Sequence, residues 1–151
     1  MIGFQPDEIL TNEATRAARL KWVIVVASDA AAGLQANAVA CVSAATAIGV
    51  TGLLGPGGPD ADGLVHAGLP WAGCTVLAAS ADQLGALIAR AGERKDLFLA
   101  DMPGVAQTNR IYDDYLAELS TVPTAESAPL AASILGPRSV VERMVKRLDL
   151  L

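Results

Sequence analysis

The chain has 151 residues, of which 52% are hydrophobic, so it is long enough to fold as one domain around a single core and too short for two. Its net charge of -5 at pH 7 argues against a general affinity for nucleic acid, because phosphate binding depends on clustered lysine and arginine. Cys41 and Cys74 form neither a disulfide framework nor a metal site by their spacing, and we expect both to be reduced thiols in the core.

The first third of the chain predicts an extension, a buried strand and a helix. Residues 1–20 form the expected N-terminal extension, with a short helix around 8–19 because acidic residues come early in it and basic residues late. Residues 21–151 are expected to form the single domain. Within it, 22–27 is a run of strand formers without alternation, which is typical of a central strand covered on both faces. The small residues of 35–50 predict a helix buried against the sheet and against another helix or a second subunit.

Glycine and proline are concentrated between Gly52 and Gly73, which predicts a long loop with an edge strand near Leu64–His66. The segment GPGGPDADG, residues 55–63, lacks the lysine and hydroxyl pair of a phosphate loop and does not lead into a helix. We therefore expect a mobile loop over a pocket, and we expect no metal or other cofactor.

The rest of the chain alternates strands with helices. A strand at 75–79 is followed by a helix that Ser80 caps, with Gln83 completing a capping box. The further expected elements are a strand at 97–100, a helix from 108 or 109 to 119, a strand at 131–135 and a terminal helix that starts at Pro137. This alternation predicts an α/β fold of three layers, in which a mixed, mainly parallel sheet of about four strands is flanked by helices.

Two of the expected strands are followed by an aspartate, Asp29 after the first and Asp101 after the third. Ligands of open α/β sheets bind at the carboxyl ends of the strands, so we predict a polar pocket in which one of these carboxylates acts catalytically, as a general base or by holding a water. The alternative is that each aspartate caps a turn. The other side chains expected around the ligand are those of Ser28, Asn37, Gln107, Thr108 and Tyr112.

Neither a membrane span nor a signal peptide is expected. The uncharged stretch 30–59 consists mostly of Ala, Gly, Ser and Thr and contains Gln35 and Asn37, which is too polar for a spanning helix. The apolar segment 22–27 is short for a signal peptide and is followed by Asp29. We therefore expect a cytoplasmic protein that does not bind a membrane.

The segment KWVIVVASDAAAGLQANAVACVSA resembles the first strand and helix of the type II peptidyl-tRNA hydrolase superfamily, K-x-V-x-V-V-R-x-D-x-x-x-G-K-G-K-x-A-A-Q-C-x-H-A. The end of the chain, SILGPRSVVERMVKRLDLL, is similar to that family's closing strand, Gly-Pro turn and helix. The positions that match the first pattern are Lys21, Val23, Val25, Val26, Asp29, Gly33, Ala38, Cys41 and Ala44. The resemblance implies a peptidyl-tRNA hydrolase II-like fold and places Gly33 at the ligand.

Several functional positions of that family are occupied by other residues here. The family's two lysines fall on Leu34 and Ala36, the second of them the one implicated in catalysis, and its histidine falls on Ser43. The segments DLFLADMPGVAQTNRIYDDYLAEL and DADGLVH are closer to a bacterial branch of the superfamily, the domain-of-unknown-function family numbered two thousand. Similarity to that branch implies the fold, a homodimer and a pocket.

The predicted function is that of a cytosolic protein that binds or hydrolyses a small polar or amide-bearing metabolite. One alternative is a peptidyl- or aminoacyl-tRNA hydrolase in which Asp101 is the base and Arg110 replaces the missing lysine. Another is a noncatalytic protein-interaction module that uses the sheet edge or the terminal helix. Because the family's catalytic lysine is absent, whether the protein is an enzyme stays open at this point. We expect a homodimer, since a chain of this size would leave the apolar helix 36–50 partly uncovered.

Overall fold

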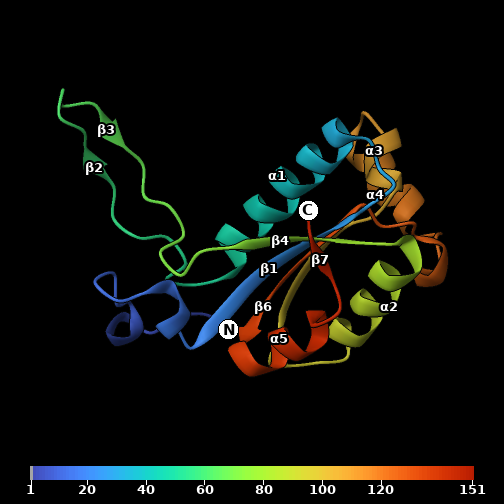
Figure 1. The fold of residues 1–151 in the computed structure, drawn as a ribbon. Coiled ribbons are helices and arrows are strands. Elements are labelled where there is room, and N and C mark those ends of the chain that lie inside the picture. Colours follow the sequence, from blue (N-terminus) through green and yellow to red (C-terminus); the bar gives the residue numbers. More distant parts are fainter. Residues whose placement is uncertain (1) are drawn as a thin grey trace.

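Strand β1 (Leu20–Ala27) lies at the centre of a five-stranded sheet in the computed structural model, which describes residues 2–151. The strand order is β5-β6-β1-β4-β7 (Figure 1). The other strands of this sheet are β4 (Thr75–Ala79), β5 (Phe98–Met102), β6 (Ala131–Pro137) and β7 (Asp149–Leu150). The predicted α/β class is confirmed, with five strands in place of about four.

The sheet is mixed, as predicted. Most of its neighbouring strands are antiparallel, so the expectation of a mainly parallel sheet is wrong. Only β1 and β4 pair in parallel, whereas β6 is antiparallel to both β1 and β5, and β7 is antiparallel to β4. A parallel pair needs a long crossover, and α1 (Ala32–Gly49) with the loop after it supplies one between β1 and β4. The segment between β5 and β6 instead returns the chain to the strand it has just left, so these two strands are antiparallel neighbours.

The side chains of β1 alternate between two cores, which confirms that this strand is covered on both faces. Val23 and Val25 pack with α2 (Ala81–Gly92) and α5 (Arg138–Val145), whereas Ile24 and Val26 pack with α1. Figure 1 shows α1 on one face of the sheet and α2 and α5 on the other. Full burial of one such side chain contributes roughly 1.5–3 kcal/mol to folding. The three predicted layers are therefore helix, sheet and helix.

Helix α2 follows its sequence signals closely. The backbone N–H of Gln83 donates to the Ser80 hydroxyl at 3.3 Å, and the backbone N–H of Ser80 donates to the side-chain oxygen of Gln83 at 2.9 Å. These two bonds satisfy amide groups that the first turn of a helix leaves without partners. The predicted capping box is thus confirmed.

Helix α1 is much more exposed than predicted. Ala38, Val42 and Thr46 form a narrow buried stripe on the sheet, while Ile48 is 92% exposed. The helix is long and apolar enough to cross a membrane by length and composition alone, with a mean hydropathy of 1.2, yet it lies along the sheet in this fold (Figure 1). The second cover expected for α1 is not provided by the described residues of its own chain.

The extension before β1 forms two short 3-10 helices, at Pro6–Glu8 and Thr15–Ala17, so the helix predicted for residues 8–19 is wrong. The carboxylate of Glu8 is engaged by the guanidinium of Arg19 and accepts a bond from the Gln5 backbone N–H at 2.8 Å, which closes a tight turn where a helix would have to start. Phe4 is buried and its ring packs edge-on against Trp71.

The glycine-rich segment forms a two-stranded arm. Its strands β2 (Gly58–Pro59) and β3 (Val65–His66) pair with each other and not with the edge of the main sheet, so the predicted edge strand is wrong. The carboxylate of Asp60 accepts bonds from the backbone N–H groups of Asp62 and Leu64, both at 2.9 Å, and so closes the tip. Figure 1 shows the arm projecting at the end of α1 that lies away from α3 and α4.

Two short helices connect β5 to β6. They are α3 (Val105–Thr108) and α4 (Tyr112–Leu119), followed by a 3-10 turn at Thr124–Glu126. The predicted helix from 108 or 109 to 119 is therefore divided at Asn109. The Asn109 side-chain amide donates to the Val105 carbonyl at 2.9 Å and to the Glu118 carboxylate at 2.7 Å, which fixes α3 against α4.

Candidate functional site

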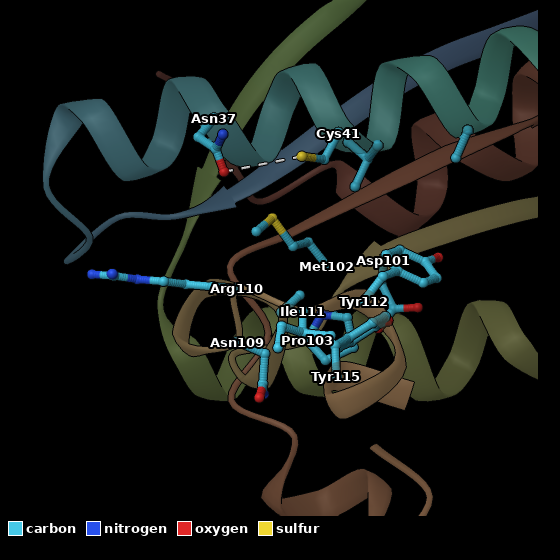
Figure 2. Close-up of a pocket in the computed structure, with 13 residues that line it drawn as sticks. Asn37, Cys41, Asp101, Met102, Pro103, Asn109, Arg110, Ile111, Tyr112 and Tyr115 are labelled. Atoms are coloured by element: carbon cyan, nitrogen blue, oxygen red, sulfur yellow. Dashed lines mark hydrogen bonds between the residues drawn. The ribbon is translucent and has the colours of Figure 1, made fainter. Parts of the chain in front are cut away.

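Asp101 lies on the edge strand β5 and lines a cavity of about 470 Å³ between α1 and the segment that leaves this strand. Figure 2 shows Asn37 and Cys41 on the α1 side of the cavity, with Asp101, Tyr112 and Tyr115 gathered on the other side. The lining residues are Asn37, Cys41, Val42, Ala45, Asp101, Met102, Pro103, Ala106, Asn109, Arg110, Ile111, Tyr112 and Tyr115. Most of the surface that lines the cavity is apolar, so the polar groups stand out against an apolar wall.

The apolar surroundings change the chemistry of Asp101. Its side chain still reaches solvent, but burial raises the pKa of its carboxyl above the ordinary value. Neither Asp101 nor Arg110 forms an ion pair within residues 2–151, although both line the cavity. A carboxyl with a raised pKa can hold or release a proton closer to neutral pH than an ordinary aspartate.

Two tyrosines border this carboxyl. The rings of Tyr112 and Tyr115 contact edge to face, with centroids 5.4 Å apart. Burial raises the pKa of the Tyr115 phenol, and the charges of Tyr112 and Asp101 raise it further. The Tyr115 hydroxyl therefore stays protonated and can donate a hydrogen bond to a ligand.

The α1 wall supplies an amide and a thiol. The Cys41 thiol donates weakly to the side-chain oxygen of Asn37 at 4.0 Å. Within residues 2–151 the side-chain nitrogen of Asn37 makes no hydrogen bond, so it is available to a ligand. Cys41 and Cys74 are both exposed, which corrects the expectation that they are core thiols. Cys74 lies elsewhere, and burial raises the pKa of its thiol to about 12.

The structure brings together three of the predicted site residues, Asn37, Asp101 and Tyr112. It does not place Asp29 in this cavity, because β6 lies between β1 and β5 and keeps the ends of those strands apart. Asp29 is exposed in the turn after β1. The prediction that the two aspartates share one pocket assumed that their strands are neighbours, and that assumption is wrong.

The other predicted ligand residues also lie outside the cavity lining. Ser28, Gly33 and Gln107 are exposed and do not border it. The Thr108 hydroxyl donates to the Val105 carbonyl at 3.1 Å, so this side chain closes the short turn of α3.

Sequence reasoning missed Tyr115 and Cys41 as wall residues. The spacing of residues along a helix does not show whether a helix face meets the core or a cavity. The signal that was present is the separation of Tyr112 and Tyr115 by three residues, which puts both rings on one side of α4. Leu116 in this helix is exposed, as is Ile111 just before it.

The donor set offers no evident metal site. Among residues 2–151 no group of three or more His, Cys, Asp or Glu side chains is placed to hold a metal ion. The polar groups on the cavity lining are carboxyl, amide, thiol, phenol and guanidinium groups.

A solved structure and a protein-family model are both similar to this chain. A solved structure of a protein of unknown function from Agrobacterium tumefaciens strain C58 superposes with a TM-score of 0.81 at 16% identity, covering 88% of this chain and 98% of that one. No curated protein matches. The model of a family described as a protein of unknown function, DUF2000, matches residues 20–151. The narrower of the two resemblances seen in the sequence is thus confirmed, and the broader one, to peptidyl-tRNA hydrolase, stays a prediction. The chain belongs to the DUF2000 family.

Proposed function

We propose that the cavity beside Asp101 binds a small metabolite that carries an amide group on an apolar body. The observation that carries the proposal is a carboxyl of raised pKa, without an ion-pair partner in residues 2–151, at a largely apolar cavity of about 470 Å³. That volume lies within the range of roughly 300–1,000 Å³ that small-molecule sites occupy. A cavity with an apolar wall and few polar groups is also typical of such sites.

The polar groups fit an amide better than a strongly charged ligand. The carboxylate of Asp101 accepts from the N–H of an amide, and the Arg110 guanidinium on the same lining donates to the amide C=O. The free side-chain nitrogen of Asn37 and the phenol of Tyr115 are two further donors on the same lining. Val42, Met102 and Ile111 offer apolar contact to the rest of the molecule.

Hydrolysis of the bound amide is a second candidate function, favoured by the raised pKa of Asp101. A carboxylate of raised basicity is suited to take a proton from a water that attacks the amide carbonyl, and to give that proton to the amine that leaves when the C–N bond breaks. We do not extend this proposal to tRNA, because Arg110 is the one cation among the described residues of the lining and RNA binding depends on several.

The test is a thermal-shift screen of amide-bearing metabolites on the full chain, followed by titration of the hits. A ligand that prefers the native state raises the melting temperature. We expect Asp101→Asn to weaken the hits at least about tenfold, which corresponds to about 1.4 kcal/mol. The matched control is Asp113→Asn, which makes the same chemical change on an exposed aspartate of α4 outside the lining.

Two results would reject the binding proposal. One is equal affinity of every hit for both variants and the wild type, and the other is the absence of any hit. Hydrolysis is tested separately by following each hit by NMR with the wild-type protein and with Asp101→Asn. Product formed only by the wild type supports the catalytic candidate, and an unchanged ligand removes it while leaving binding intact.

A further inference from the structure

A second cavity, of about 580 Å³, lies between α2 and α5. These helices cover the face of the sheet opposite α1 (Figure 1), and the two cavities share no lining residue. Four cations border it: Arg90 from α2, and Arg143, Lys146 and Arg147 from α5 and the turn after it. They are four of the 11 lysines and arginines of the chain.

These four cations have no partners within residues 2–151. None of them forms an ion pair or a side-chain hydrogen bond there, and the described lining contains no acidic side chain. Elsewhere in the same structure Arg19 and Arg94 are paired with carboxylates. The chain has 16 acidic residues, so the lack of acids around this cavity is not due to a shortage of them.

The base of the cavity is apolar. Leu87 is fully buried, and Met144 and Leu148 are half-buried. The side chain of Gln83 is engaged at its oxygen by the cap of α2. A cationic rim over an apolar floor suits a ligand with negative groups on a small organic body.

The helix dipole explains part of this arrangement. A cation in the last turn of a helix is stabilised by the partial negative charge there, and Arg90 and Arg143 occupy such positions. The dipole does not explain why cations from two separate helices border one cavity. A cation that faces open solvent would stabilise the end of each helix equally well.

We propose that the cavity between α2 and α5 binds a small phosphorylated metabolite that carries at least two negative charges. Arginine forks donate paired bonds to phosphate oxygens, and a polyanion relieves the mutual repulsion of the cations. A long nucleic acid is disfavoured, because four cations make a short footprint and the net charge of the chain is -5. The site is independent of the cavity at Asp101.

The experiment is calorimetric titration of the full chain with inorganic pyrophosphate at low salt. The cavity variant is Arg90→Gln with Arg147→Gln. The control is Arg16→Gln with Lys95→Gln, two exposed cations outside this cavity whose removal changes the net charge by the same amount. We expect the wild type and the control to bind alike and the cavity variant to lose at least about tenfold in affinity.

All the substituted side chains are exposed, and unchanged circular dichroism and melting temperature would show that each variant is folded. No binding by the wild type, equal binding by all three proteins, or equal losses in the two variants would overturn the proposal. Two further titrations use a single-stranded oligonucleotide and vesicles containing phosphatidylserine. Tighter binding to either of them than to pyrophosphate, lost in the cavity variant, would also overturn it in favour of an extended polyanion.

Discussion

The indole N–H of Trp22 on β1 donates to the hydroxyl of Ser133 on β6 at 2.8 Å. The Ser133 oxygen lies 2.6 Å from the hydroxyl oxygen of Thr46 on α1, and the Thr46 hydroxyl donates to the Val42 carbonyl at 2.7 Å. Because the one hydroxyl proton of Thr46 is donated to the Val42 carbonyl, the Ser133 hydroxyl is the donor in its bond with Thr46. The result is a one-way chain of bonds that ties the middle of the sheet to α1, and Ser133 and Thr46 are the fully buried polar residues of the described chain.

Ser133→Ala breaks this chain at its centre. The substitution leaves the Trp22 N–H buried without an acceptor, so we expect the free energy of unfolding to fall by about 1–3 kcal/mol. Urea denaturation followed by tryptophan fluorescence measures the change. Ser139→Ala on the exposed surface of α5 is the control and should stay within about 0.5 kcal/mol of the wild type. Equal stability of the two variants would contradict the assigned bonds.

Gly136 on β6 is a position where a methyl group does not fit. An added Cβ would lie 2.8 Å from the Asp96 carbonyl oxygen and 2.3 Å from a methyl group of Leu97. We expect Gly136→Ala to lower the free energy of unfolding by about 1–3 kcal/mol, because the backbone next to it would have to move. Gly85→Ala on α2 meets no atom within 4 Å and should instead raise stability by about 0.5–1 kcal/mol. Thermal and urea denaturation of both variants will show whether the two substitutions change the free energy of unfolding in opposite directions.

Asp101 should make stability depend on pH. Its pKa is raised in the folded protein, so between the unfolded and folded pKa values the folded state binds more protons. Stability therefore falls as the pH rises through that window, and below the unfolded value of 3.8 the penalty is absent. We expect the melting temperature of Asp101→Asn to exceed that of the wild type near about pH 7, with the difference disappearing toward about pH 3. A difference in melting temperature between the two proteins that grows as the pH is lowered would contradict a raised pKa of Asp101.

The exposed, uncharged face of α1 is the surface that we propose for a homodimer. Ile48 is 92% exposed on this helix, and no Asp, Glu, Lys or Arg occurs within Ala32–Gly49. Sedimentation equilibrium should give twice the monomer mass of 15.4 kDa for the wild type and the monomer mass for Ile48→Glu. Ala89→Glu, on an exposed position of α2, should remain dimeric. A monomeric wild type at high concentration would reject the proposal.

Local signals in the sequence predicted local structure well. The cap at Ser80 and the uninterrupted apolar run of β1 both depend on residues that are near one another in the chain, so they can be read directly. Boundaries were less accurate where a side chain forms an unexpected bond, as at Glu8 in the extension and Asn109 between α3 and α4.

The strand order could not be predicted in the same way. The position of β6 between β1 and β5 depends on pairing between segments about a hundred residues apart, such as Val25 with Ala132, and no local pattern encodes it. The candidate site depended on that order. Asp101, Asn37 and Tyr112 were found because they lie at ends of elements that meet, whereas Asp29 was included on an assumed adjacency that β6 prevents.

Strand β7 has a consequence for the behaviour of the molecule at high concentration. Asp149 and Leu150 pair with β4, which would otherwise present an open row of amide and carbonyl groups at that margin of the sheet. A strand of two residues that carries a carboxylate is a poor template for another chain. Strand β7 thus covers the edge of β4, and an exposed edge of that kind would be a template for pairing with another chain.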